Sequence, residues 1–298
     1  MDKVIMIVGP TAVGKSALGI DLAKQFNGEI ISGDSMQIFR HLDIGTAKVL
    51  PEEMQGVPHH LLNIRNPDEK FSAHDFQQAA GNLVREITAR GHVPIIVGGT
   101  GFYLRMFLLG WQLGTERQSN HITDGLSDEA AWQKLNIADP AAAAKIPVAN
   151  RRRVERALAV IAETGQLFSD QGDDLTPAYD ACVIGLNTER QQLYARINAR
   201  VDQMIAQGLE KEARWLYAQG GADWPAGKGI GYREWWPYFA GQASLPATVD
   251  RIKADSRHYA KRQLTYFRHQ LPVHWFNLLE NPAEENKIKP LVASFLTR

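Results

Sequence analysis

Residues 9–16, GPTAVGKS, form a glycine-rich loop that ends in a lysine and a hydroxyl. They fill every fixed position of the phosphate-binding pattern G-x-x-x-x-G-K-[ST], and they lie between an apolar run at 4–8 and an amphipathic stretch, the context that this pattern needs. Glycine lets the backbone form a cup of N–H groups, Lys15 adds a mobile charge, and the Ser16 hydroxyl suits Mg²⁺. We therefore predict a loop that binds a diphosphate or triphosphate, with Ser16 as metal ligand, made of Gly9, Pro10, Thr11, Ala12, Val13, Gly14, Lys15 and Ser16.

Two other expected strands also end in groups that can do chemistry. The strand at 29–34 ends in Asp34, and the strand at 93–99 is followed by Thr100. The carboxyl ends of parallel strands share one edge of a sheet, so we expect both groups to lie near the phosphate loop. Taken singly, each residue is as well explained as a turn or helix cap. Together beside this loop they favour a group-transfer site, since neither a Walker B acid nor an N-K-x-D motif is apparent.

Alternation of strand and helix patterns defines the expected fold. Apolar, β-branched runs predict strands, and apolar residues three to four apart predict helices. A segment with little strand signal interrupts this alternation: 112–127 is polar and loop-like, and 128–136 and 139–165 read as helices. The prediction is an α/β protein with a P-loop NTPase-like core, a parallel sheet flanked by helices, and a small all-helical insertion. The core comprises 1–111 and 182–298, and the insertion comprises 112–181. Further expected elements are strands at 183–187 and 273–278 and helices at 74–90, 189–206 and 250–270.

Bulk composition indicates an ordinary globular protein. Of the 298 residues, 44% are hydrophobic and 22% are charged, and the formal net charge is zero, so a nucleic-acid partner would have to meet a local basic surface. The single cysteine, Cys182, excludes an internal disulfide. Neither a signal peptide nor an apolar run long enough to span a membrane is apparent, and we expect a cytoplasmic protein without a membrane partner.

Several stretches resemble the tRNA dimethylallyltransferase family. DSMQIFRHLDIGTAK (34–48) and YAKRQLTYFR (259–268) are the most specific of them. The resemblance runs in order along nearly the whole chain. The other matching stretches are GPTAVGKS (9–16), HHLLNI (59–64), GGTGFYLR (98–105), DPAAAAKI (139–146), RALAV (156–160), LYARINARVDQMIAQGLEKEARWL (193–216) and GIGYRE (229–234).

The resemblance implies transfer of a dimethylallyl group from dimethylallyl diphosphate to the exocyclic amine of the adenosine 3′ of the tRNA anticodon. Catalytic roles then fall to Asp34 as general base, to Thr100 in orienting the amine, and to Lys15 in stabilising the diphosphate with Mg²⁺. Family analogy also places Ser35, Met36 and Gln37 around the flipped base. No other cofactor is implied.

Two basic segments are expected to bind the RNA. One spans 251–269, with interleaved aromatic residues, and the other spans 150–156 in the insertion. A basic helix alone is more often a solvated face, and Arg233, Lys261 and Arg262 are open to an alternative role at the diphosphate. The predicted tRNA-binding residues are Asp34, Ser35, Met36, Gln37, Lys48, Thr100, Arg152, Arg153, Arg156, Lys261 and Arg262, which would contact the anticodon stem-loop.

Competing interpretations stay open at this point. A P-loop small-molecule kinase would share the core and could use the arginines at 151–156 as a lid, and a relative could transfer dimethylallyl to free adenine nucleotides. A third alternative is a non-enzymatic RNA-binding nucleotide switch, but no base-reading or switch motif is apparent in the sequence. His59 and His60 are expected to be structural or next to the substrate, and Trp235 and Trp236 to pack in the interior. We expect a monomer, because tRNA would occupy much of one face.

Overall fold

The computed structural model describes three stretches of the chain, residues 1–110, 122–170 and 176–298. The chain folds into two compact units. Residues 1–110 and 177–298 form the larger one, called unit 1, and residues 111–176 form the smaller one, called unit 2.

The insertion predicted at 112–181 corresponds to unit 2. Its start at 112, and most of the loop expected at 112–127, lie outside the described residues. At its end, unit 1 resumes at Pro177 and the next strand begins at Asp180, ahead of the boundary that the sequence places at 181.

Unit 1 is built on a parallel sheet. The described residues give it six strands in the order β3-β2-β4-β1-β5-β6, so β1 lies inside the sheet and β6 at one edge. Every pairing is parallel, for example Ile5 of β1 opposite Ile95 of β4. This confirms the expected α/β class, and it places the carboxyl ends of β1, β2 and β4 at one edge. The strands are β1 Lys3–Val8, β2 Gly28–Ser32, β3 His59–His60, β4 Val93–Gly98, β5 Asp180–Leu186 and β6 His274–Phe276.

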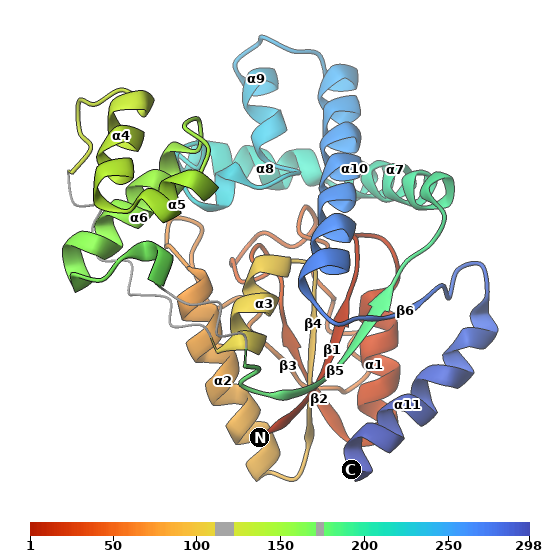
Figure 1. Cartoon of the computed structure of the whole chain (residues 1–298). Coiled ribbons are helices and arrows are strands. Elements are labelled where there is room, and N and C mark those ends of the chain that lie inside the picture. The colour runs from red at the N-terminus through yellow and green to blue at the C-terminus, as the bar shows by residue number, and fades with distance from the viewer. Residues whose placement is uncertain (111–121, 171–175) are drawn as a thin grey trace. The chain divides into compact units, whose positions relative to one another are not determined.

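Helices cover both faces of this sheet (Figure 1). Side chains of β1 alternate between the two cores: Ile5 and Ile7 pack with α1 and α11, and Val4, Met6 and Val8 pack with α2 and α3. Both faces are therefore apolar, as the continuous hydrophobic runs of the strands require. The helices of unit 1 are α1 Lys15–Phe26, α2 Ala73–Ala89, α3 Gly101–Leu109, α7 Arg190–Gln207, α8 Leu209–Ala218, α9 Trp236–Phe239, α10 Leu245–Gln270 and α11 Glu285–Thr297.

A third apolar cluster supports the segment that follows β2. Ile38, Phe39 and Leu42 of this segment pack against α8, the residues around Tyr232, and Trp235. The segment is thus fixed by helices that come much later in the sequence. The same segment carries Asp34 and Gln37.

Unit 2 is helical over its described residues. It contains α4 Asp128–Ala138, α5 Pro140–Lys145 and α6 Arg151–Thr164. The helical stretch predicted at 139–165 is divided between α5 and α6: α5 ends before Ile146, whose extended backbone (φ −113°, ψ 112°) precedes Pro147. A residue before proline is disfavoured in the α region, which explains the break. Asp139 caps α5 through Ala142 N–H at 3.0 Å.

Candidate active site

The phosphate loop joins β1 to α1 at the carboxyl edge of the sheet. Gly9 has a φ of +143°, and a Cβ there would lie 2.5 Å from the carbonyl oxygen of Leu186, so only glycine fits. Gly14 also has a positive φ, +103°, immediately before α1 begins at Lys15. Lys15 Nζ donates to the Pro10 carbonyl at 2.7 Å, across the loop. The loop therefore has the strand–turn–helix geometry that its sequence predicts.

Three side chains from distant helices hold this loop. Gln263 of α10 accepts from Thr11 N–H at 2.9 Å and donates to the Gly99 carbonyl at 2.9 Å, which ties the loop to the end of β4. Arg196 Nε donates to the Ala12 carbonyl at 2.9 Å, and Arg200 lies 3.5 Å from the Thr11 hydroxyl. The interpretation of the sequence missed all three. The spacing of Arg196 and Arg200, four residues apart on one helix face, was the available signal.

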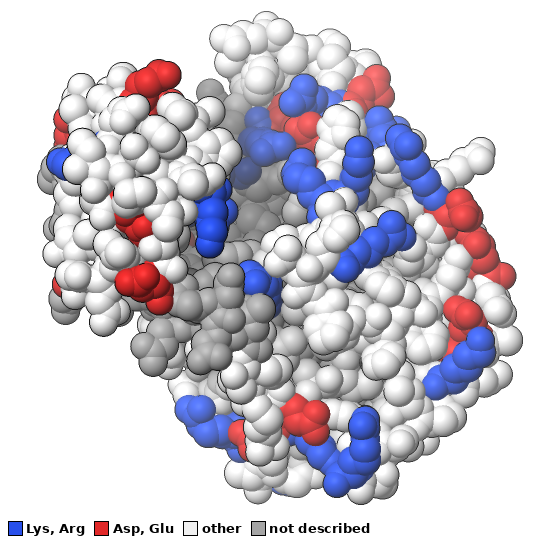
Figure 2. Space-filling model, viewed as in Figure 1, with Lys and Arg blue, Asp and Glu red and all other residues white. Residues whose placement is uncertain are grey.

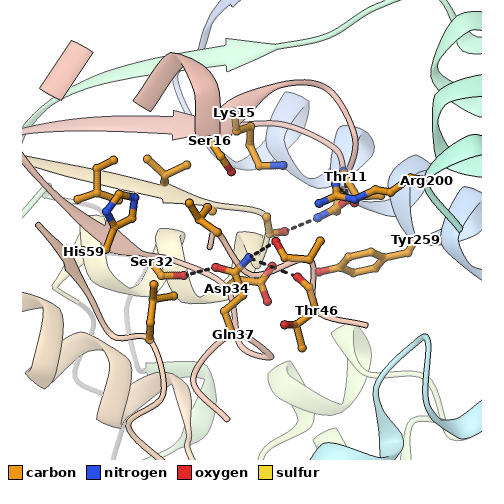
Figure 3. A pocket seen from close by; sticks show the side chains of 18 residues that line it. Thr11, Lys15, Ser16, Ser32, Asp34, Gln37, Thr46, His59, Arg200 and Tyr259 are labelled. Atoms are coloured by element: carbon orange, nitrogen blue, oxygen red, sulfur yellow. Dashed lines mark hydrogen bonds between the residues drawn. The ribbon is translucent and has the colours of Figure 1, made fainter. Parts of the chain in front are cut away.

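A cavity of about 730 Å³, counted to its open mouth, lies between this loop and the segment after β2. Figure 3 shows Lys15, Asp34 and Arg200 among the residues that line it. The lining residues are Thr11, Lys15, Ser16, Ile30, Ser32, Asp34, Gln37, Thr46, Ala47, Val49, His59, Leu62, Val97, Gly98, Gly99, Arg200, Tyr259 and Gln263.

Asp34 and Thr100 come together as the strand order predicts. Asp34 Oδ1 accepts from Met36 N–H at 2.9 Å. Thr100 Oγ1 accepts from Ser35 N–H at 3.0 Å and donates to Ser35 Oγ at 3.2 Å. Asp34 thus does cap its own turn. Thr100, in contrast, makes no side-chain cap to α3, so its hydroxyl is used across the strand ends instead.

Glycines allow these strand ends to approach so closely. A Cβ on Gly98 would lie 2.2 Å from the Gly33 carbonyl oxygen, and one on Gly99 would lie 2.2 Å from Gln263 Nε2. The Gly33 oxygen belongs to the backbone and cannot give way, whereas the Gln263 amide would have to move and give up its bond to the Gly99 carbonyl. Larger residues here would separate Asp34 from the loop.

Burial and neighbouring charges tune the cations of the cavity. The pKa of Lys15 is lowered to about 8, chiefly by burial; the Asp34 charge raises it and the Arg200 charge lowers it. Burial also lowers the pKa of Arg200, against the raising effect of Asp34. The pKa of the Tyr259 hydroxyl is raised by burial and by the Asp34 charge, so that hydroxyl stays protonated. A polyanion brought to this place would meet two cations already partly stripped of water.

Gln37 occupies the opposite wall of the cavity. Its Oε1 accepts from the Ser32 hydroxyl at 2.9 Å, and its Nε2 lies 3.3 Å and 3.4 Å from the carbonyls of Thr46 and Ala47. These partners fix which end of the amide is the donor. Ser32 and Thr46 were not predicted as site residues, although Thr46 lies in the family-like stretch 34–48 that also contains Gln37.

Lys48 has a different place from the one expected. Its side chain is 4% exposed, and Nζ bonds the Phe39 carbonyl at 2.7 Å, Asp43 Oδ1 at 2.6 Å and Asn63 Oδ1 at 2.7 Å. An ammonium group has three hydrogens, and all three are used. Burial lowers the pKa of Lys48, and Asp43 opposes this. We therefore reassign Lys48 from RNA binding to holding its own loop.

The other predicted RNA-binding cations lie on two helices. On α10, Lys261 and Arg262 are exposed, with the Arg262 guanidinium 5.7 Å from the centre of the Tyr259 ring. Figure 2 shows Lys and Arg side chains gathered over α10. In unit 2, Arg152 and Arg153 are exposed on α6 and Arg156 is half-buried.

Arg233, for which the sequence left open a role at the diphosphate, forms ion pairs outside the cavity. Its guanidinium pairs with Asp255 at 2.9 Å and with Glu234 at 2.9 Å. Arg233 is not among the residues that line the cavity. These contacts give it a structural role between the segment before α9 and α10.

The histidine pair at 59–60 and the tryptophan pair at 235–236 have the following contacts. His59 lines the cavity, with Nδ1 2.8 Å from the Val57 carbonyl, whereas His60 Nε2 lies 2.6 Å from Glu29. His59 is thus next to the cavity and His60 is structural. Trp235 is fully buried, and the half-buried Trp236 packs against the same apolar cluster and donates to the Gly227 carbonyl at 3.1 Å.

Over residues 1–110, 122–170 and 176–298, no group of three or more His, Cys, Asp or Glu side chains could hold a metal ion. In the same part of the chain, no helix is both long and apolar enough to cross a membrane.

A family model described as IPP transferase matches residues 37–270. This chain belongs to the IPP transferase family. The match includes the cavity wall at Gln37, both predicted basic segments and the Gln263 that braces the phosphate loop. The family expected from the sequence is confirmed.

Individual family members are similar over most or all of their length. The chain is 53% identical to a tRNA dimethylallyltransferase of Limosilactobacillus reuteri (strain DSM 20016) over 308 residues, covering 100% of both. It is 43% identical to the crystal structure of the full-length tRNA isopentenylpyrophosphate transferase from Bacillus halodurans, with a TM-score of 0.78, and covers 97% of that chain. A eukaryotic dimethylallyltransferase acting on tRNA matches with a TM-score of 0.90 at 28% identity, over 80% of its chain.

Proposed function

We propose that this chain transfers a dimethylallyl group from dimethylallyl diphosphate to the exocyclic amine of the adenosine 3′ of the anticodon in tRNA, releasing diphosphate. Its relatives are named for dimethylallyl transfer to tRNA, and one solved neighbour is described as acting on tRNA. The observation that carries the proposal is the cavity that joins a phosphate loop with two cations to the Asp34 carboxylate. That pairing suits a reaction with an anionic leaving group and a nucleophile that must lose a proton.

The donor diphosphate is assigned to the phosphate loop. As the allylic carbon–oxygen bond breaks, its electron pair passes to the diphosphate. The loop amides, Lys15 and Arg200 stabilise the growing charge, and they are pre-positioned at the cavity wall. The Ser16 hydroxyl lines the same wall and is a hard oxygen ligand, so it fits Mg²⁺ held jointly with phosphate oxygens. When bound, Mg²⁺ would neutralise part of the charge on the leaving group.

The acceptor amine is assigned to the side of Asp34. The new carbon–nitrogen bond uses the amine lone pair, so one amine proton must leave. Oδ1 of Asp34 already accepts from Met36 N–H, and we assign Oδ2 as the oxygen that takes the proton. Thr100 orients the amine, and Ser35, Met36 and Gln37 surround the base, which must be flipped out of its stack.

The RNA stem-loop is assigned to cations of two helices, α10 and α6. Lys261 and Arg262 on α10 and Arg152, Arg153 and Arg156 on α6 are suited to phosphate contacts. The helical insertion would then bind the anticodon stem. We expect the enzyme to act as a monomer in the cytoplasm, because tRNA is its substrate and covers much of one face.

The decisive experiment is incorporation of label from dimethylallyl diphosphate with Mg²⁺ present. Three acceptors are compared: an anticodon stem-loop with adenosine 3′ of the anticodon, the same RNA with guanosine there, and free AMP. We expect label in the first RNA alone, and we expect Asp34→Ala to abolish it. Label in AMP would instead assign a free-nucleotide substrate. Absence of label, together with consumption of ATP in the presence of small acceptors, would overturn the proposal in favour of a kinase.

A further inference from the structure

The loop Leu42–Lys48, called here the acceptor loop, is held by a carboxylate that no motif singles out. Glu212 of α8 accepts from three consecutive backbone N–H groups: Asp43 at 2.7 Å, Ile44 at 2.9 Å and Gly45 at 2.9 Å. Oε1 also accepts from the Tyr232 hydroxyl at 2.6 Å. Consecutive N–H groups of this kind form a concave anion site, and here the protein's own carboxylate fills it.

Packing fixes the acceptor loop on the same side. A Cβ on Gly45 would lie 2.7 Å from both Cζ and the hydroxyl of Tyr232, so the backbone passes directly over that ring. Tyr232 is fully buried in the third apolar cluster. Its ring and hydroxyl therefore cannot shift without disturbing Trp235 and Leu209 around it.

Lys48 holds the other end of the acceptor loop. Its three bonds, to the Phe39 carbonyl, Asp43 and Asn63, connect the loop to the neighbouring backbone. The Thr46 hydroxyl closes the turn by donating to the Leu42 carbonyl at 2.7 Å. Both ends are thus fixed, and Thr46 and Ala47 between them face the cavity.

The acceptor loop in turn positions Gln37. The carbonyls of Thr46 and Ala47 lie within 3.4 Å of Gln37 Nε2, and the Ser32 hydroxyl fixes the other end of the amide. A chain of contacts therefore runs from Glu212, outside the cavity lining, through the loop backbone to a side chain in the cavity wall. The contacts of the phosphate loop, from Gln263, Arg196 and Arg200, are separate from this chain.

We propose that Glu212 is a positioning residue for the acceptor base: it fixes the acceptor loop so that the loop carbonyls orient Gln37. The proposal rests on the function proposed above. Its consequence is selective, since Glu212 serves the use of RNA and leaves the binding of the isoprenoid diphosphate unaffected.

The first test is the Glu212→Gln variant, which keeps the side-chain shape but turns one oxygen into a donor that opposes a backbone N–H. We expect kcat/KM for the adenosine stem-loop to fall about tenfold or more, because hydrogen bonds to a charged group are lost. KM for dimethylallyl diphosphate should stay within about twofold of wild type. The matched control is Glu210→Gln on the same helix, which removes an exposed pair with Arg214 and should change neither constant.

A double-mutant cycle with Gln37→Ala separates positioning from general structural support. If Glu212 acts through Gln37, adding Glu212→Gln to Gln37→Ala should lower kcat/KM for the stem-loop by less than about twofold further. Effects of the two changes that simply multiply would overturn the proposal. An equal rise in KM for both substrates in Glu212→Gln would also overturn it.

Folding and function are checked independently. Tyr232→Phe keeps the carboxylate and its three backbone partners, and we expect a loss of kcat/KM for RNA of about threefold or less with a folded protein. If Glu212→Gln lowers the melting temperature strongly, the proposal is tested with Tyr232→Phe instead. A rise in KM for dimethylallyl diphosphate in that variant would overturn the proposal. If the wild-type protein does not label the stem-loop, the proposed function itself is wrong. This outcome is distinct from any result with the variants, because it concerns the unchanged protein.

Discussion

The two walls of the cavity are built on different physical principles. The donor wall, the phosphate loop with Lys15 and Arg200, presents backbone N–H groups and cations, and distant side chains brace it from behind. The acceptor wall, from Asp34 to Lys48, presents neutral groups and the Asp34 carboxylate; contacts within the segment shape it, and Glu212 of α8 holds its backbone. The donor wall is suited to recognising charge, and the acceptor wall to recognising shape and hydrogen-bond pattern.

This contrast explains why the cations of the two walls differ in their access to a ligand. Lys15 and Arg200 line the cavity, where a polyanion can reach them. Lys48 is equally cationic, but it is buried and all its hydrogens are used within the protein. A charge that recognises a ligand must be left accessible, whereas a charge that holds a loop must be satisfied internally. The predictions below test this division, from the largest expected effect to the smallest.

Asp34→Asn should have the largest effect, because it removes the proton acceptor while keeping an oxygen for Met36 N–H. We expect single-turnover rates to fall about 1,000-fold, the middle of the range for general base catalysis, with little change in either KM. Asp202→Asn, on an exposed ion pair with Lys253, is the matched control. A variant Asp34→Asn that retains most of the wild-type rate would remove Asp34 from the mechanism.

The pH profile of donor capture should report Lys15. Its pKa is lowered to about 8, so the ammonium is charged below that pH and loses its charge as pH rises through about 8, rather than near 10.5. Since the charged form binds the diphosphate, kcat/KM for the donor should fall about tenfold per pH unit above this point. Lys15→Arg keeps its charge, and its profile should be flat up to pH 9.5 or so. A fall of the same size in Lys15→Arg would assign the titration to another group.

Arg200→Ala should affect the donor wall alone. We expect KM for dimethylallyl diphosphate to rise about tenfold and KM for the stem-loop to stay unchanged, since one charge-assisted contact is lost. Arg190→Ala, on the same helix and stacked on Tyr194 5.1 Å away, serves as control. An increase confined to the RNA KM would place Arg200 on the acceptor side and would contradict the division between the walls.

The smallest effects should distinguish Lys48 from Lys261. Lys48→Met should lower the free energy of unfolding by about 1–3 kcal/mol, because buried acceptors lose their partner, and should leave the salt dependence of RNA binding unchanged. Lys261→Ala should leave stability unchanged and reduce the slope of log K against log salt by about 0.7–0.9, one phosphate contact. Urea unfolding and binding titrations at several salt concentrations measure both. A reduced slope in Lys48→Met would restore its predicted role in RNA binding.

The amino-acid sequence by itself determined the phosphate loop, the class of the fold and the meeting of Asp34 with Thr100. The loop is readable because its chemistry resides in consecutive residues with backbone requirements, as at Gly9 and Gly14. The meeting of Asp34 and Thr100 is readable because parallel strands put their carboxyl ends at one edge. The end of α5 was also present in the sequence, at Pro147, because the residue before a proline is disfavoured in the α region.

Only the tertiary structure decided the partners of these groups. Arg200, Gln263 and Glu212 reach the site from helices that follow it by well over a hundred residues, so no local pattern connects them to Thr11 or Gly45. The burial of Lys48 was equally unreadable, because a lysine in a polar loop has the same sequence signature whether its ammonium meets water or three oxygens of the protein. Local motifs specify backbone shape, whereas side-chain environment is set by which surfaces pack together after the chain has folded.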